Sequence, residues 1–243
     1  MLRSMRADLH IHTCLSPCAD LKMSPSAIAE QAKLKEIDIL GICDHNSAEN
    51  VPALIKAARK FKLNVLPGME VTSQEEVHIL ALFDTAEAAF KLQQVVYGHL
   101  PGENDEKAFG MQVVVNEKGE VLRFNKRLLI GASTLSVERV VETIHSFHGL
   151  AIASHIDREG FSLVSQLGFI PEHLMLDALE ISPKTSLEEA KSRFQNTFPF
   201  TTFSDAHFLE EIGKACTCFY IEEGNTEEIR KALQNEEGRK IIH

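Results

Sequence analysis

Short apolar runs alternate along this chain with segments that carry apolar residues at helical spacing. Residues 37–43, for example, are almost continuously apolar, which is typical of a strand buried on both faces. Ser24 followed by Pro25 predicts a helix start, since serine caps a first turn and proline fits its first position. Strands that alternate with helices predict parallel βα units. Strands are expected near 8–13, 37–43, 64–70, 77–83, 150–155, 178–181, 199–204 and 216–221, and helices near 25–35, 51–61, 86–96, 136–147, from 186 onward, and 225–235.

The alternation breaks between about residues 97 and 134. Two apolar runs, 111–115 and 120–124, flank Asn116-Glu117-Lys118-Gly119, a pattern typical of a β-hairpin. We interpret this segment as an insertion between barrel units. It could be a lid, the contact of a homo-oligomer, or a simple surface excursion. With no repeat or linker elsewhere, one domain over 1–243 is expected.

Length and charge narrow the class of protein. A chain of 243 residues fits a single α/β barrel, and 44% hydrophobic with 25% charged residues is an ordinary globular balance. The net charge of -10 offers no electrostatic footprint for duplex DNA or an anionic membrane, so long nucleic acid is disfavoured as a partner. Bound divalent cations could still invert the local field and admit a small anion.

Neither the apolar runs nor the cysteines suggest a membrane or secreted protein. The chain has no apolar run near the roughly 18 residues that span a bilayer, and its first six residues do not lead into a signal sequence. The cysteines lack zinc-ribbon spacing, so we expect them to be reduced in a cytoplasmic protein, with a metal-proximal role open for two of them, Cys14 and Cys18.

Candidate chemistry begins at Asp8-Leu9-His10-Ile11-His12. On a strand, alternate side chains share a face, so Asp8, His10 and His12 are expected to point the same way. Two imidazoles at this spacing suit a divalent metal ion. The neighbouring Asp8 could orient one ring from behind.

Several later strands end in the same kind of residue. In a parallel barrel the carboxyl ends of all strands meet on one face, so these residues should converge. His78 fits less well, because it lies near the beginning of its expected strand. The strand-end residues are His12, Asp44-His45, Glu70, His155 and Asp205-Ala206-His207.

This set of ligands predicts a reactive metal centre. Imidazoles and carboxylates without a thiolate set select zinc, manganese, iron or similar ions. Six histidines and at least two carboxylates exceed the needs of one ion, so two or three divalent ions are expected, with Glu70 able to bridge. Clustered ions lower the pKa of bound water and hold both oxygens of a displacement, which suits phosphoester hydrolysis.

Taken in order, these motifs resemble those of the PHP (polymerase and histidinol phosphatase) family, and its nucleoside- and nucleotide-phosphatase branch in particular. The resemblance implies a distorted (β/α)7 TIM-like barrel, a trinuclear metal site, and hydrolysis of phosphomonoesters or short phosphodiesters by a metal-bound hydroxide. The implied substrate is a small phosphorylated metabolite or nucleotide. The motifs are His10-Ile11-His12-Thr13, Cys43-Asp44-His45, Gly68-Met69-Glu70, Val77-His78, Ser154-His155 and Ser204-Asp205-Ala206-His207.

The resemblance also implies which residues hold each ion. The first ion would take His10, His12, Glu70 and Asp205; the second Glu70, His78 and His155; the third His45, His207 and a residue from the loop after His12. The chain departs from the family pattern in that loop, which reads Thr13-Cys14-Leu15-Ser16-Pro17-Cys18-Ala19-Asp20. Asp20 is the expected third-site ligand, and Cys18 is the second choice.

Two cationic residues are candidates for binding the substrate. Arg158 resembles the family's phosphate-contacting arginine, although it could instead pair with Asp157 or Glu159. Lys184 follows a later strand end. The residues expected to take part in the chemistry are Asp205, His207 and Arg158.

Two other interpretations compete with the phosphoesterase. Amidohydrolases also use His-x-His on a first barrel strand, but this chain has no clear position for a carbamylated lysine. A non-catalytic metal-binding PHP domain would show degenerate ligands, and almost none is visible. Parallel assays with phosphoesters and amides, together with a metal count, would separate the three.

Overall fold

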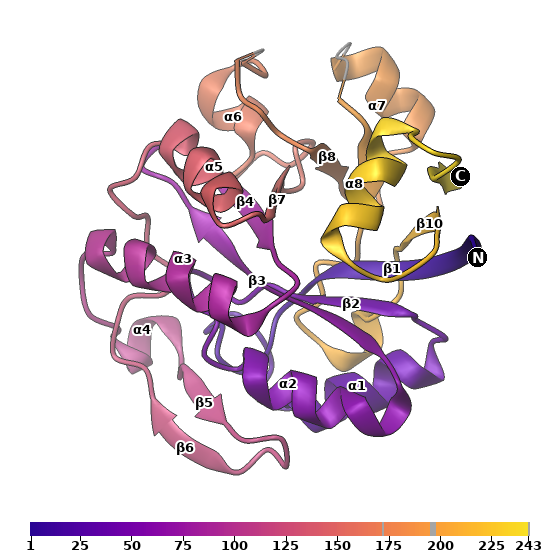
Figure 1. The fold of residues 1–243 in the computed structure, drawn as a ribbon. Coiled ribbons are helices and arrows are strands. Elements are labelled where there is room, and N and C mark those ends of the chain that lie inside the picture. Colours follow the sequence, from indigo (N-terminus) through magenta and orange to yellow (C-terminus); the bar gives the residue numbers. More distant parts are fainter. Residues whose placement is uncertain (172, 195–197, 243) are drawn as a thin grey trace.

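The eight expected strands and one that was not expected, β11, form a curled, nine-stranded sheet in a computed structural model, which describes residues 1–171, 173–194 and 198–242 (Figure 1). The order across the sheet is β11-β10-β1-β2-β3-β4-β7-β8-β9. Its strands are β1 (Arg3–Ile11), β2 (Ile39–Ile42), β3 (Asn64–Thr72), β4 (His78–Leu82), β7 (Leu150–Ala153), β8 (Ala178–Ile181), β9 (Phe200–Thr202), β10 (Thr217–Ile221) and β11 (Lys240–Ile242).

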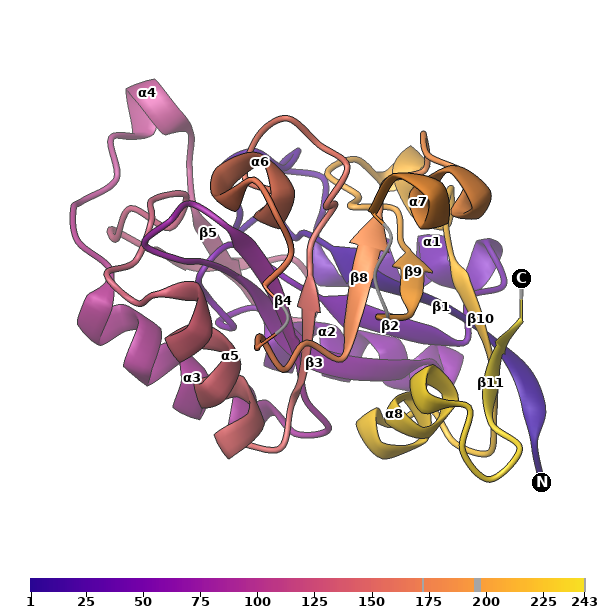
Figure 2. The same cartoon turned by 90° about the horizontal axis from the view of Figure 1, so that it is seen from above.

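Helices cover the outside of the curl, as Figures 1 and 2 show. One apolar cluster lies between helices and sheet, where Ile28, Leu54 and Val140 meet strand residues such as Ile79. A second cluster, including Leu80, lies on the other face of the strands. The helices are α1 (Pro25–Leu34), α2 (Val51–Ala58), α3 (Ala86–His99), α5 (Val137–Ser146), α6 (Leu163–Leu167), α7 (Leu187–Phe194) and α8 (Thr226–Gln234), with 3-10 turns η1 (Arg59–Phe61) and η2 (Leu209–Glu211).

Two of the expected strands run against the expected direction, and one of them, β10, is antiparallel to both β1 and β11. Strands β1, β2 and β3 are parallel, as are β7, β8 and β9, but β4 is antiparallel to both of its neighbours. The link from β3 to β4 is a short turn, and a parallel pair needs a crossover of a dozen residues or more. The expectation of parallel units throughout was therefore wrong here. The reversal places the first residue of β4, His78, opposite Thr72 at the end of β3.

The segment that follows β9, at one edge of the sheet, returns to the end of β1 and pairs with it. The backbone amide of His12 donates to the carbonyl of Ala206 at 3.0 Å, and the amide of Ala206 donates to the carbonyl of His10 at 3.2 Å. This bridge brings the segment after β9 against the end of β1. The α/β, TIM-like class expected from the sequence is confirmed, as a sheet curled into a half-barrel.

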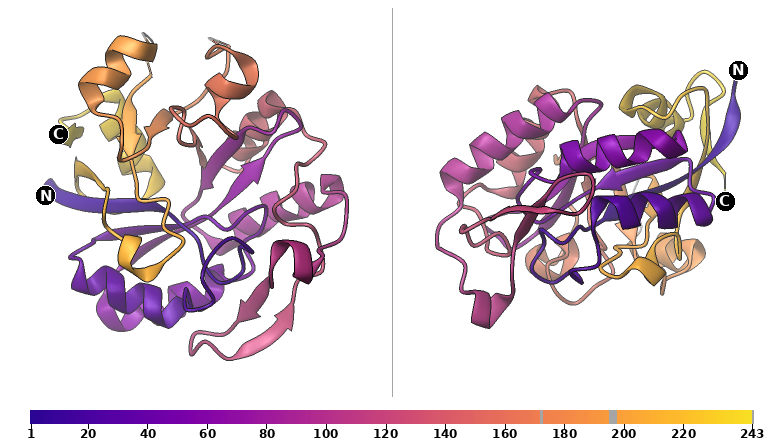
Figure 3. Two further views of the ribbon diagram at one scale, coloured as in Figure 1. Left: turned by 180° about the vertical axis from the view of Figure 1, so that it is seen from behind. Right: turned by 90° about the horizontal axis from the view of Figure 1, so that it is seen from below.

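The expected insertion contains the expected hairpin, β5 (Val113–Val115) and β6 (Val121–Phe124), after a short helix α4 (Glu106–Phe109). The hairpin lies beside α2 (Figure 3). The side chain of Asn50, just before α2, holds β5 by accepting from the amide of Val115 and donating to the carbonyl of Val113. The insertion is therefore anchored to the body of the domain through its inner strand.

Strand β2 approaches β1 so closely that a side chain would not fit at Gly41. A Cβ there would lie 2.3 Å from the carbonyl oxygen of Leu9. We expect Gly41→Ala to lower the free energy of unfolding by about 3 kcal/mol, measured by urea denaturation. Gly98→Ala, in helix α3 with nothing within 4 Å, is the control and should be neutral or stabilising. Equal stability of the two variants would contradict the close approach.

Candidate metal centre

A single buried carboxylate, that of Glu70 on β3, lies at the middle of the predicted site. It is 1% exposed, and a ring nitrogen from each of five histidines lies within 3.5 Å of it. Those distances are 2.9 Å to Nδ1 of His78, 3.1 Å to Nδ1 of His45, 3.3 Å to Nε2 of His155, 3.4 Å to Nε2 of His10 and 3.5 Å to Nε2 of His12.

Asp205, in the segment after β9, is the second carboxylate of the cluster. Its Oδ1 lies 3.2 Å from Nε2 of both His10 and His12, and 3.7 Å from Nδ1 of His207. Its Oδ2 lies 2.5 Å from Nη1 of Arg158. Residues from opposite ends of the chain thus meet at one edge of the sheet.

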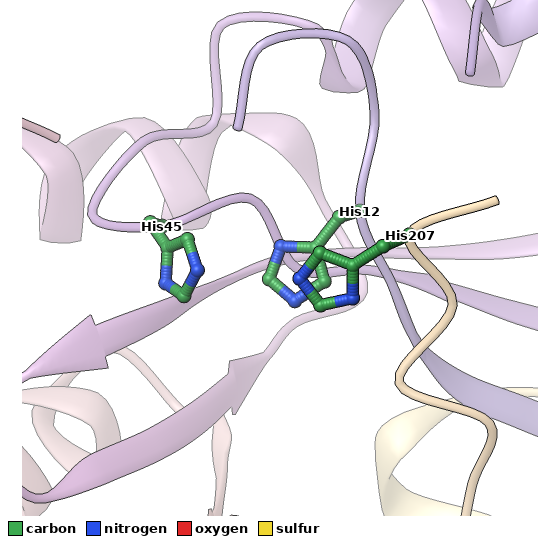
Figure 4. A group of neighbouring side chains, drawn as sticks. All are labelled: His12, His45 and His207. Atoms are coloured by element: carbon green, nitrogen blue, oxygen red, sulfur yellow. The ribbon is translucent and has the colours of Figure 1, made fainter. Parts of the chain in front are cut away.

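Three groups of side chains offer donor atoms within 4.8 Å of one another, the spacing that one ion can bridge. They are His10, His12 and Asp205; His45, Glu70 and His78; and His12, His45 and His207. Figure 4 shows the three rings of the last group, with His12 and His207 overlapping and His45 beside them.

The chemistry of these donors fits metal ions. Among the described residues, four buried atoms of the cluster have no hydrogen-bond partner: Nδ1 of His45, His78 and His155, and Oε1 of Glu70. Buried polar atoms are normally hydrogen-bonded, so imidazole and carboxylate atoms that lie close together without a hydrogen bond, such as Nδ1 of His78 and Oε1 of Glu70, fit a cation site. Neutral imidazole and carboxylate oxygen suit zinc, manganese or iron.

The histidines at the end of β1, His10 within the strand and His12 just after it, are held from behind by different groups. Nδ1 of His10 lies 3.0 and 3.1 Å from the two carboxylate oxygens of Glu180 on β8. Nδ1 of His12 lies 3.0 Å from the hydroxyl of Ser16, which donates in turn to Asp44 at 2.7 Å. Asp44 therefore acts on the centre through a serine, as a residue that orients a ligand.

The expectation that Asp8 orients a ring was wrong. Its carboxylate accepts from the backbone amides of Ser204 at 3.0 Å and Gly213 at 2.8 Å. The register of β1 against β2 shifts between Asp8 and Ile11, and such an irregularity re-aims side chains. Simple alternation along β1 therefore fails at the point where the site begins.

Burial and mutual charge set the protonation of the cluster. Burial lowers the pKa of His12 to about 4, with nearby His207 adding to the effect, and burial also holds the pKa of His45 well below its usual value. Both rings are therefore neutral near pH 7, the form that binds metal. Burial raises the pKa of Glu70, but the charges of His78 and His10 outweigh it and hold that pKa well below normal.

Two residues of the centre adopt left-handed backbone conformations. His155 has a φ of 29° and Asp205 a φ of 49°. For residues other than glycine this conformation is costly and persists only where the surroundings enforce it. Both residues lie just after strands, where the chain must turn sharply to bring their side chains back over the sheet edge.

The centre opens into a pocket of about 1000 Å³. Arg158, Lys184 and Lys214 supply positive charge to its walls, and Ile130 of the insertion contributes an apolar side. Arg158 pairs with Asp205, whereas Asp157 accepts hydrogen bonds from Ser182 and Thr185. The alternative pairing of Arg158 with Asp157 is therefore not the one that the structure shows.

The structure brings together eight of the nine predicted metal ligands; Asp20 is the exception. The carboxylate of Asp20 accepts from the backbone amide of Lys22 at 2.7 Å, and Asp20 belongs to none of the three donor groups found among the described residues. Cys18 lies in the wall of the pocket together with His45 and His207. Of the two candidates from this loop, the cysteine is therefore the one that faces the centre.

Sequence reasoning missed Glu180 altogether. The signal was present, because Ala178-Leu179-Glu180-Ile181 places one acidic residue in an otherwise apolar buried strand. An acidic residue in such a run is buried only when it is paired. Its partners, however, lie 170 and 25 positions away and could not be identified from spacing.

A curled α/β sheet thus gathers six histidines and two carboxylates at one edge, where they could bind metal ions, as in the class of metal-binding α/β proteins. The sequence comparisons name the family. The chain belongs to the PHP domain family, whose pattern matches residues 8–163, and residues 191–237 match the PHP-associated family. The resemblance to the PHP family inferred from the motifs is thereby confirmed.

One curated relative is the uncharacterized protein YqxK of Bacillus subtilis, which is 26% identical over 259 residues; the match covers 99% of this chain and 65% of that protein. A lesion-specific endonuclease from Pyrococcus furiosus has the same fold, with a TM-score of 0.73, 22% identity, and coverage of 99% of this chain and 58% of that one. An Endonuclease Q complex with a duplex that carries an abasic lesion gives a TM-score of 0.69, 22% identity and coverage of 99% and 59%.

A further similar structure is a two-domain protein from Bacteroides vulgatus, described as containing a predicted PHP-like metal-dependent phosphoesterase. It gives a TM-score of 0.55 at 14% identity and covers 99% of this chain and 65% of that one. At these identities the structures show a shared fold. Within the described residues, no helix combines the length and apolar character needed to cross a bilayer.

Proposed function

We propose that this protein is a metal-dependent phosphoesterase that hydrolyses a small phosphorylated metabolite or nucleotide. The observation that carries the proposal is the position of Glu70, shared among five histidines beside an arginine that faces the pocket. A centre able to hold more than one cation, next to a fixed guanidinium, suits an anionic substrate whose charge grows during reaction.

Different residues of the site would hold the metal ions and bind the substrate. His10, His12, Glu70 and Asp205 would hold one ion, Glu70, His78 and His155 a second, and His45 and His207 a third. Such ions, when bound, activate water and neutralise phosphoryl charge. The guanidinium of Arg158 can turn from Asp205 to grip a non-bridging oxygen in a bidentate manner. Nδ1 of His207 donates to the carbonyl of Asp205 at 2.8 Å, which leaves Nε2 free to bind an ion or to hold the proton of a leaving group.

The walls of the pocket support a phosphorylated substrate of modest size. Lys184 and Lys214 add positive charge near Arg158, although the chain as a whole carries -10. The volume of about 1000 Å³ is at the upper end of the range for small-molecule sites. The local sign of the charge, rather than the net charge, decides which anion enters.

A second candidate function is cleavage of a phosphodiester in DNA. It is favoured by the similarity to the lesion-specific endonuclease and to the complex of Endonuclease Q with a duplex. A protein of this fold therefore binds long nucleic acid, and the net charge of -10 is not enough to exclude it here. This chain spans 58% of that endonuclease, so a duplex-binding activity is a proposal that requires its own test.

The decisive experiment is a parallel assay of one metal-loaded preparation. The substrates are a nucleoside monophosphate, a chromogenic phosphodiester, a duplex with an abasic site and a chromogenic amide. Turnover of the first two, with little on the duplex, is the expected result. Cleavage of the duplex alone would replace the first candidate with the second. Turnover of the amide alone would establish the amidohydrolase, and a metal-loaded protein inert on all four would be a non-catalytic domain.

Arg158 should matter more than the exposed lysine beside it. We expect Arg158→Ala to lower kcat/KM on the best phosphoester by about 10²-fold, since a donor to developing phosphoryl charge is lost. Lys184→Ala should cost less than about tenfold, because its charge lies in water. Steady-state kinetics test both variants, and an Arg158→Ala effect as small as that of Lys184→Ala would contradict the role in phosphate binding.

A further inference from the structure

We propose that Glu180 is a positioning residue that fixes ligands of two different metal subsites at once. The inference rests on the proposed metal centre but not on the identity of the substrate. Glu180 lies on β8, is 1% exposed, and belongs to none of the three donor groups found among the described residues. Its carboxylate meets Nδ1 of His10 and not the nitrogen that faces Glu70 and Asp205, so it acts on a ligand from behind.

The first ligand that Glu180 holds is the ring of His10. Both carboxylate oxygens lie within 3.1 Å of Nδ1, while Nε2 of the same ring lies 3.4 Å from Glu70 and 3.2 Å from Asp205. The ring is thus placed between two sets of carboxylates, with one nitrogen toward the cluster and the other toward Glu180. A carboxylate at Nδ1 favours the tautomer that carries its proton there and leaves Nε2 free for a metal ion.

The second ligand that Glu180 holds is His155, through its backbone. The amide of His155 donates to the Glu180 carboxylate at 3.3 Å, and the amide of Ile156 donates to the Glu180 carbonyl at 2.9 Å. This is the point where the chain adopts a φ of 29°. Contacts from both the side chain and the backbone of one residue stabilise the unusual conformation that sends the ring of His155 toward Glu70.

Among the described residues, no other histidine of the cluster has at its Nδ1 a carboxylate from outside the proposed ligands, since Nδ1 of His45 and of His78 faces Glu70 itself. Nδ1 of His12 meets the hydroxyl of Ser16, and Nδ1 of His155 has no hydrogen-bond partner among the described residues. In the proposed arrangement, His10 and His155 would each help to hold one of the two ions to which Glu70 contributes. Because one carboxylate orients a ligand of each, its removal should weaken both subsites together.

The test compares Glu180→Ala, Glu180→Gln and the control Asp157→Asn. Asp157 is a carboxylate of the neighbouring loop that accepts hydrogen bonds from Ser182 and Thr185, and within the described part of the chain no hydrogen bond or ion pair joins it to an imidazole. Zinc affinity is measured by competition with a chromophoric chelator, and the tautomer of His10 by long-range ¹H–¹⁵N correlation on the zinc-loaded protein. Neither readout requires a known substrate, so failure of the proposed hydrolysis would leave this test intact.

Glu180→Ala is expected to lower zinc affinity by about 10–100-fold at two sites and to leave the His10 ring without a defined Nδ1–H signal. Glu180→Gln keeps one acceptor oxygen and should retain the signal with a smaller loss. Asp157→Asn should change neither quantity. Zinc affinity in Glu180→Ala within twofold of the unmodified protein would overturn the proposal, as would equal losses in both Glu180 variants with the His10 tautomer unchanged. If the alanine variant does not fold, the glutamine variant against Asp157→Asn decides the question by the same readouts.

Discussion

Glu70→Gln is expected to reduce the rate of phosphoester hydrolysis by at least about 10³-fold. The substitution removes several kcal/mol of charge stabilisation at the metal centre, and each 1.36 kcal/mol corresponds to a tenfold change in rate. The substitution preserves shape but removes the negative charge that five imidazoles face. An amide also presents donor hydrogens to nitrogens that should bind a cation. Metal content should fall together with turnover, measured by inductively coupled plasma mass spectrometry and a phosphate-release assay.

The matched control is Glu228→Gln in α8. That carboxylate is also largely buried, but it does not line the pocket. Its Oε1 lies 2.9 Å from Nη2 of Arg239. It should leave both turnover and metal content unchanged. Should Glu70→Gln retain its metals and more than a tenth of the activity, Glu70 is not the shared ligand and the arrangement of ions proposed above is wrong.

The second large effect is on stability. A ligand at about 1,000 times its Kd stabilises the folded state by about 4 kcal/mol, and for a chain of this size each kcal/mol moves Tm by roughly 2–4 °C. Removing the metals with a chelator should therefore lower Tm by about 10 °C. The apo protein retains the buried Nδ1 atoms of His45 and His78, which make no hydrogen bond and lie against the Glu70 carboxylate, so these are atoms that the ions would satisfy.

Differential scanning calorimetry measures this change in Tm, with zinc or manganese added back in excess of the chelator as the control for reversibility. Re-addition should restore the original Tm. Identical melting curves for the loaded and the chelated protein would show that the cluster does not bind metal in the folded state, and both the hydrolysis and the positioning proposal would then fail.

Much of the fold and the site followed from local pattern. The apolar runs located the strands, and the residues that end them located the metal centre, because parallel strands present their carboxyl ends at one edge. The same logic undervalued His78, which begins its strand. Since β4 is reversed, its first residue lies at the edge of the sheet where the parallel strands end. The short turn before β4 was the one feature of the sequence that indicated this reversal.

What could not be predicted depends on contacts between distant residues. Glu180 pairs with a histidine 170 positions earlier, and Asp8, next to that histidine in the pattern, bonds backbone amides instead. The choice between Asp20 and Cys18 depends on how one loop folds over the centre, which neither residue type determines. The alternation of residues along a strand predicts which face of the sheet each side chain lies on. An irregularity in the strand pairing, or a partner from another strand, can change the direction in which a side chain points.

The donors of the centre come from positions as far apart as His10 and His207, and Ala206 is joined to the backbone of His10 and His12. Any one piece of the chain therefore contains only some of the metal ligands. Tight metal binding requires that the N-terminal and C-terminal parts of the chain pack together. Retention of the metals should accordingly report completion of folding: a nick in a central loop followed by separation of the pieces would release every ion, whereas a nicked chain that stays associated would keep them.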